Sequence, residues 1–122
     1  MALIVDDLEV MDWFVRMKGI SVNLWITDPP YPFNSQNGTN RYSGMYQRFT
    51  WCKLELVYKE MFDLTSNGGR AYIFSNRDNL VKTIEVLEKV GFSMDGEFLS
   101  ARVKNGQRVD VKHYGIVNPR KQ

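Results

Sequence analysis

The sequence is poor in the residues that cross-link a chain or bind metals. Its 122 residues include one cysteine, Cys52, and one histidine, His113, which excludes an internal disulfide and a multi-cysteine zinc site. No metal site is predicted. No apolar run approaches the roughly 20 residues of a membrane span, and acidic residues begin at Asp6, so neither a membrane segment nor a signal peptide is expected. The cysteine usage predicts a reducing, cytoplasmic setting.

What the chain does contain is typical of one globular domain spanning residues 1–122. Hydrophobic residues make up 43% and charged residues 25%, which excludes a disordered chain. The charge is unevenly distributed. Residues 1–33 carry five acidic and two basic side chains, whereas residues 100–122 carry six basic and one acidic. The basic C-terminal region fits a phosphate-binding surface or a solvated strand.

Hydrophobic spacing along the chain alternates between helical and strand periodicity. It predicts helices over 7–18, 51–65 and 77–90, and strands over 22–27, 70–74, 92–103 and 109–117, with a turn at Asn105-Gly106. Strands that alternate with helices predict an α/β fold, in which a parallel sheet is closed by a C-terminal antiparallel hairpin.

A polar segment at 32–50 is expected to be a loop, which is long for a compact domain. Basic and aromatic side chains are interleaved within it. Because such side chains contact phosphates and stack on bases, the loop is a candidate nucleic-acid interface. A solvated loop without that role is the alternative. The candidate contacts in and beside it are Phe33, Arg41, Tyr42, Tyr46 and Arg48.

The motif Asp28-Pro29-Pro30-Tyr31 directly follows the predicted strand 22–27. Ligands of open α/β sheets bind beyond the carboxyl ends of the strands. Two consecutive prolines remove two N–H donors, so a carboxylate beside free carbonyls forms an acceptor-only site. Such a site matches an exocyclic amino group, and the Tyr31 ring offers a stacking face for a base. The alternative is a rigid proline turn in which Asp28 caps the backbone and Tyr31 is half-buried.

This motif and its surroundings resemble the DNA amino-methyltransferases, which use S-adenosylmethionine to methylate adenine N6 or cytosine N4. Residues 22–31 are similar to the catalytic strand and motif of that family. Further similarity lies in the opening segment 6–11, the helix 51–62, the glycine-containing strand entry 67–76 and the junction 87–92. The resemblance covers most of the chain and implies a partial Rossmann-like methyltransferase sheet with flanking helices.

The resemblance also implies roles for the motif. The target base is flipped out of DNA, its amino nitrogen is held by Asp28 and the Pro29 carbonyl, and Tyr31 stacks on the ring. Asp28, Pro29, Pro30 and Tyr31 are the predicted catalytic residues, and Asp28 and Pro29 are also expected to touch the cofactor. Asp28 and Tyr31 are expected to carry function rather than fold. Cys52 is expected to have no catalytic role.

One feature of that family is missing, namely the Phe-x-Gly-x-Gly strand that binds the cofactor. The chain resembles the catalytic half that comes first in one circular arrangement of the family. A split enzyme with a complementary half, a truncated gene product and a fragment all fit this pattern. Weak binding of S-adenosylmethionine is therefore expected. A catalytically silent module that binds nucleic acid or a partner subunit is the alternative function, and methylation of RNA or of a glutamine side chain is a third.

Without the cofactor strand, the predicted strand 22–27 would lie at an edge of the sheet with one side unpaired. An uncovered apolar edge templates pairing with another chain. We therefore expect a homodimer in which two copies bury these strands or the faces that flank them. The alternative is that the loop 32–50 or the helix 7–18 folds over the edge.

Overall fold

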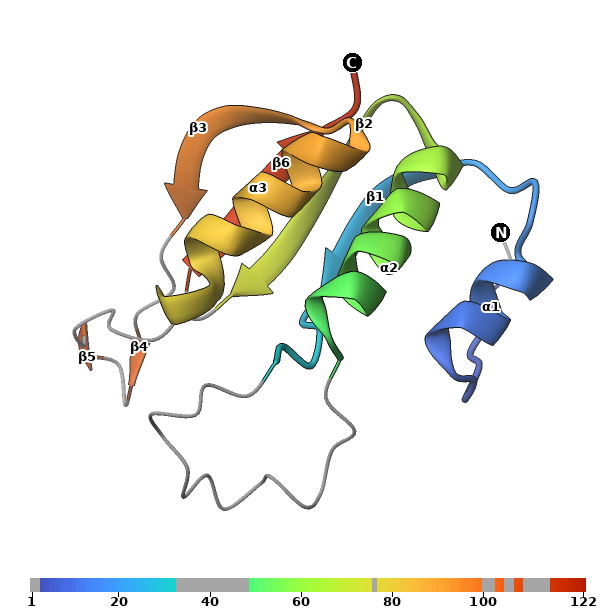
Figure 1. The fold of residues 1–122 in the computed structure, drawn as a ribbon, viewed down its shortest axis with the longest axis horizontal. Coiled ribbons are helices and arrows are strands. Elements are labelled where there is room, and N and C mark those ends of the chain that lie inside the picture. The colour runs from blue at the N-terminus through green and yellow to red at the C-terminus, as the bar shows by residue number, and fades with distance from the viewer. Residues whose placement is uncertain (1–2, 33–48, 76, 100–102, 105–106, 109–114) are drawn as a thin grey trace.

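A computed structural model describes residues 3–32, 49–75, 77–99, 103–104, 107–108 and 115–122. Figure 1 shows the arrangement of the elements along the chain. In chain order they are α1 (Val10–Arg16), β1 (Val22–Thr27), α2 (Trp51–Leu64), β2 (Thr65–Ser75), the 3-10 turn η2 (Arg77–Asn79), α3 (Leu80–Val90), β3 (Ser93–Leu99), β4 (Val103–Lys104), β5 (Gln107–Arg108) and β6 (Gly115–Arg120). Within the described part of the chain, no helix is long and apolar enough to cross a membrane.

The main sheet has four strands in the order β1-β2-β6-β3. Strand β1 runs parallel to β2, whereas β6 runs antiparallel to both β2 and β3. The predicted α/β fold and the predicted edge position of β1 are therefore confirmed. The last strand of the C-terminal antiparallel pair lies inside the sheet, between β2 and β3. The predicted turn Asn105-Gly106 lies outside the described residues, between the short paired strands β4 and β5.

Several element boundaries differ from the predicted ones. Helix α1 begins at Val10 because Glu9 precedes it as the N-cap, where its carboxylate accepts a hydrogen bond from the Met11 N–H at 2.8 Å. Strand β2 begins at Thr65 instead of residue 70. Thr65 of β2 pairs with Val22 of β1, and Arg70 pairs with Leu24. Residues 66–69 of β2 therefore lie opposite a single residue of β1 and form an irregular bulge. Gly68 adopts a φ of 82° within it.

The hydrophobic core lies between one face of the sheet and the helices. Side chains in β2 alternate, and Ala71, Ile73 and Ser75 are buried against the helix layer. The fully buried side chains of that layer include Leu54 and Tyr58 of α2 and Leu87 of α3. Helix α1 packs on the same face of the sheet. Its Trp13 and Phe14 contact Trp25 of β1, and Trp25 lies beside Ala71, which faces the helix layer.

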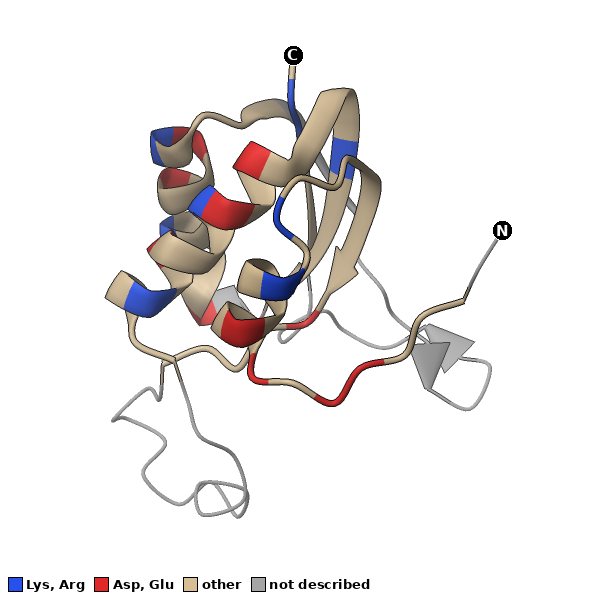
Figure 2. Ribbon diagram, turned by 90° about the vertical axis from the view of Figure 1, so that its right-hand side faces the viewer, with Lys and Arg blue, Asp and Glu red and all other residues tan. Residues whose placement is uncertain are grey.

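The opposite face of the sheet has no described helix on it (Figure 2). Strand register places Ile26 beside Tyr72, and Phe74 beside Ile116, on this face. Leu24 and Ile26 are 52% and 70% exposed, while the side chains from β2 and β6 are half-buried. We call this surface the open face; its apolar residues are Leu24, Ile26, Tyr72, Phe74 and Ile116.

Candidate acceptor site at the end of strand β1

The Asp28-Pro29-Pro30-Tyr31 motif directly follows β1, as the sequence predicts. Because β1 and β2 are parallel, with Thr27 beside Ile73, their carboxyl ends reach the same edge of the sheet. Ser75 ends β2 at that edge. The motif therefore occupies the position at which open α/β sheets bind ligands.

Tyr31 is the motif residue that is most deeply buried, with 6% of its surface exposed. Its hydroxyl donates a hydrogen bond to the carbonyl of Phe74 at 2.8 Å and lies 3.4 Å from the Tyr58 hydroxyl. Its ring packs against Trp51, with centroids 5.9 Å apart. This corrects the expectation that Tyr31 carries function rather than fold, because the side chain is part of the core. Its stacking on a base stays a prediction.

The two phenols in this cluster are hydrogen-bonding groups rather than acids or bases. Burial raises the pKa of Tyr31, and the hydrogen bond with Tyr58 only partly opposes that effect. Burial, followed by the proximity of Tyr31, raises the pKa of Tyr58 as well. Both hydroxyls therefore stay protonated at neutral pH, and their role is to fix the position of the motif.

Asp28 lies at the surface, and its side chain is exposed. Even so, the surrounding protein desolvates the carboxyl group, which raises the pKa of Asp28 above the ordinary value of 3.8. Desolvation is the one cause of the shift, so no described cation or hydrogen-bond donor lowers that pKa. The Asp28 carboxylate therefore has no charged or hydrogen-bonding partner among the described residues.

The two proline carbonyls of the motif differ in their surroundings. The Pro30 carbonyl accepts a hydrogen bond from the Phe49 N–H at 2.8 Å, which brings together the two ends of the segment predicted as a loop. Among the described residues, no donor meets the Pro29 carbonyl. In the described part of the chain, neither the Asp28 carboxylate nor the Pro29 carbonyl meets a hydrogen-bond donor, and their role as the two acceptors that the resemblance implies stays a prediction.

The predicted nucleic-acid contacts belong to a different part of the chain from Asp28 and Pro29. Phe33, Arg41, Tyr42, Tyr46 and Arg48 all lie outside the described residues, and their roles stay predictions. No group of three or more potential metal ligands occurs within the part of the chain that the structure describes.

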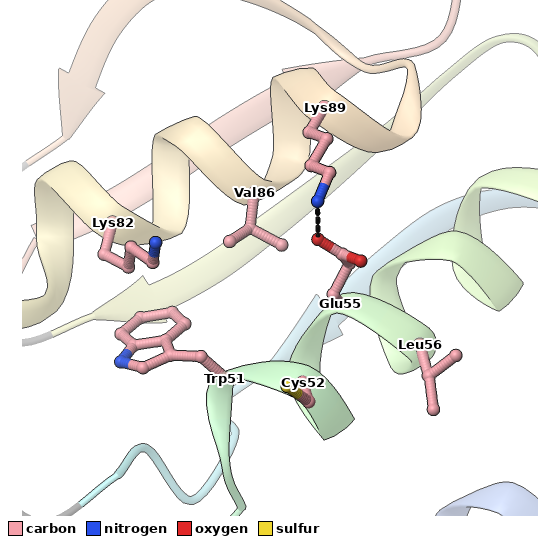
Figure 3. Close-up of a pocket in the computed structure, with 7 residues that line it drawn as sticks. All are labelled: Trp51, Cys52, Glu55, Leu56, Lys82, Val86 and Lys89. Carbon is pink, nitrogen blue, oxygen red and sulfur yellow. Dashed lines mark ion pairs between the residues drawn. The ribbon is translucent and has the colours of Figure 1, made fainter.

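A separate pocket of about 400 Å³ lies between α2 and α3 (Figure 3). The Nζ atom of Lys89 forms an ion pair with Glu55 across it, at 2.7 Å. No residue of the Asp28–Tyr31 motif lines it. The residues that do are Trp51, Cys52, Glu55, Leu56, Lys82, Val86 and Lys89.

Trp51 belongs both to this pocket and to the packing of Tyr31. Trp51 is not among the predicted site residues. Its position in the sequence could have indicated this contact. Trp51 starts the helix that follows the long predicted loop, and the other end of that loop is the end of β1.

Replacing Tyr31 with Phe should destabilise the protein by about 1–2 kcal/mol, because the buried Phe74 carbonyl loses its donor. Tyr58→Phe is the matched control and should cost less, since its contact with Tyr31 is 3.4 Å long. Urea denaturation of both variants, with unchanged m-values, measures the difference. Equal stability of Tyr31→Phe and the wild type would mean that the hydroxyl does not anchor the motif.

Replacing Asp28 with Asn should leave the melting temperature unchanged or raise it by a few degrees. The folded-state pKa is raised, so ionisation of Asp28 opposes folding as the pH rises above 3.8. The variant lacks that penalty at neutral pH and should lose its advantage below pH 3.8. Thermal unfolding at several pH values tests the sign. A marked loss of stability at neutral pH would assign Asp28 a structural role.

Comparisons with known proteins add a structural likeness but no sequence match. No protein-family profile and no curated protein matches the sequence. TTHA0409 of Thermus thermophilus, named as a DNA modification methylase and solved with S-adenosyl-L-methionine, superimposes with a TM-score of 0.64 at 19% identity. That match covers 93% of this chain and 51% of TTHA0409.

Two further solved structures share the arrangement. The M1.HpyAVI–SAM complex gives a TM-score of 0.64 at 18% identity, over 94% of this chain and 52% of M1.HpyAVI. The N-methyltransferase NodS from Bradyrhizobium japonicum gives 0.53 at 10% identity, over 88% of this chain and 50% of NodS. This chain spans about half the length of these proteins. The described residues therefore have part of a methyltransferase fold, and the solved structures that share it include one named as a DNA modification methylase.

Proposed function

We propose that this chain is the catalytic half of a DNA methyltransferase that modifies the exocyclic amino group of adenine (N6) or cytosine (N4). The observation that carries the proposal is the acceptor pair of Asp28 and Pro29. It stands at the carboxyl end of β1, in a chain whose fold is shared with named DNA methylases.

The acceptor pair suits an amino group because such a group donates two hydrogen bonds. The Asp28 carboxylate accepts one and the Pro29 carbonyl the other, which orients the nitrogen lone pair away from both acceptors. The partly desolvated environment strengthens the bond to Asp28. Positioning and electrostatics are then the contribution of this chain, and Cys52, an exposed free thiol, takes no part.

S-adenosylmethionine is the proposed methyl donor, since TTHA0409 and M1.HpyAVI were both solved with it. Asp28 and Pro29 are the candidate contacts, and the pocket between α2 and α3 contains neither. The sequence also lacks a Phe-x-Gly-x-Gly strand. We therefore assign most of the cofactor site to a complementary methyltransferase half.

The isolated chain should bind S-adenosylmethionine weakly or not at all. Isothermal titration should show no saturable heat at millimolar ligand, whereas M1.HpyAVI, which was solved with this ligand, serves as the positive control. Saturable binding at micromolar concentration would contradict this assignment, because it would require a cofactor site within these residues.

Methylation itself is best tested in a host without DNA methylation that expresses the native polypeptide containing this chain. Nucleoside mass spectrometry of the host DNA should detect N6-methyladenine or N4-methylcytosine. Asp28→Asn should abolish the signal. Asp63→Asn, which removes a surface carboxylate paired with Lys59, should preserve it.

The absence of both modified bases, or the appearance of C5-methylcytosine, would contradict the proposed function. Binding of DNA by the protein, without any methylation, would support the alternative of a catalytically silent nucleic-acid-binding module. The proposed setting is the cytoplasm.

A further inference from the structure

The start of helix α2 contacts the Asp28–Tyr31 motif at two points. The Phe49 N–H, two residues before the helix, donates a hydrogen bond to the Pro30 carbonyl at 2.8 Å. The ring of Trp51, the first helical residue, packs against the Tyr31 ring with centroids 5.9 Å apart. A shift of these residues is therefore transmitted to the motif.

Lys53 contacts both residues that precede α2. Its ammonium group lies 4.2 Å from the centroid of the Phe49 ring, which is the geometry of a cation–π contact. Its backbone N–H donates to the Thr50 hydroxyl at 3.1 Å, which makes Thr50 the N-cap of the helix. One residue of the first turn thus fixes the entry into α2.

The ammonium group of Lys53 is also anchored to α1. Its Nζ atom donates to the Oε1 atom of Glu9 at 2.8 Å. The other carboxylate oxygen accepts the Met11 N–H as the N-cap of α1, so the carboxylate is held from both sides. The hydrogen bond from Lys53 lowers the pKa of Glu9, and the carboxylate is charged at neutral pH.

This ion pair differs from the other lysine pair of α2 in what it joins. Lys59 pairs with Asp63 one turn further along the same helix, at 2.9 Å. Lys53 instead reaches Glu9, 44 residues away in the sequence, and covers the Phe49 ring on the way. Both pairs are partly exposed, and exposed ion pairs contribute little to global stability. The contacts of Lys53 are therefore suited to a local, positional role.

We propose that Lys53 is a positioning residue of the Asp28–Tyr31 motif. Its ammonium group, held by Glu9, keeps Phe49 in place, and the Phe49 N–H in turn fixes the Pro30 carbonyl. Since the Pro29 carbonyl is joined to Pro30, fixing Pro30 restricts the orientation of that proposed acceptor. The proposal deepens the proposed function and rests on it for a methylation readout, whereas its amide-exchange readout requires no methylation.

Amide hydrogen exchange at Phe49, measured in the native polypeptide that contains this chain, tests the positioning directly. Lys53→Met should speed this exchange by about two- to fivefold, the range that the energy of an exposed ion pair allows. Lys53→Arg should keep the wild-type rate, because a guanidinium group can pair with Glu9 and stack on the ring. Lys59→Met is the matched control, which breaks the pair with Asp63 and should leave the exchange at Phe49 unchanged.

A double-variant cycle tests whether Lys53 acts through Glu9. Glu9→Gln should speed the exchange at Phe49 to a similar extent as Lys53→Met, and the double variant should add little to either. Additive effects of the two substitutions would contradict the proposed link. The melting temperature of each variant should stay within a few degrees of the wild type, and a large loss in Lys53→Met would assign Lys53 a structural role instead.

Methylation kinetics of the same variants test the consequence for the site. Lys53→Met should lower kcat more than it raises KM for DNA, because the motif orients the amino group, while Lys53→Arg and Lys59→Met should retain the wild-type kcat. Unchanged exchange at Phe49 in Lys53→Met, or equal acceleration in Lys59→Met, would overturn the positioning role even in an active enzyme. A wild type that shows the expected exchange pattern but no methylation would support the positioning role and contradict the proposed function.

Discussion

The hydrogen bond from the Tyr31 hydroxyl to the Phe74 carbonyl joins the ends of two parallel strands. Tyr31 follows β1 by four residues, and Phe74 lies next to the last residue of β2. With Tyr31 held in the core at one end and β1 paired at the other, the segment between them has little freedom. The Asp28 carboxylate and the Pro29 carbonyl lie in that segment. Their placement therefore depends on a core interaction as much as on the two prolines.

The second constraint is that the sheet is covered on one side only. The helix layer buries Ala71, Ile73 and Val117, which gives the chain a core of its own. The other face carries no described helix, and β1 has a described strand partner on one side only. The chain matches about half of each of these solved structures. All-parallel sheets are usually covered on both faces, whereas antiparallel pairs, such as β2-β6 and β6-β3 here, can leave one face in water.

Much of the fold could be predicted from local sequence patterns. Helical periodicity predicts α2 and α3, and a short β-prone run before Asp28 predicts β1 and hence the position of the motif. The bulge at 66–69 was not predicted, because Gly68 and Gly69 indicate a break and not an irregular stretch of strand. The position of β6 between β2 and β3 depends on long-range pairing, which has no local signature.

The sequence left the burial of Tyr31 open for a similar reason. Its partners Tyr58 and Phe74 are 27 and 43 residues away in the sequence. An aromatic residue after two prolines is compatible with a solvent-facing ring or with a core anchor, and only the tertiary contacts decide between them.

The ionisation of Asp28 reports directly on whether the end of β1 holds a partly desolvated carboxylate without a donor of its own. Carbon-detected NMR of the side-chain carboxyl, followed through a pH titration, measures that ionisation. We expect a pKa for Asp28 above 3.8, because desolvation is its one perturbation. A pKa at or below 3.8 would contradict the account, since it would mean that a cation or a hydrogen-bond donor of the protein already occupies the acceptor site.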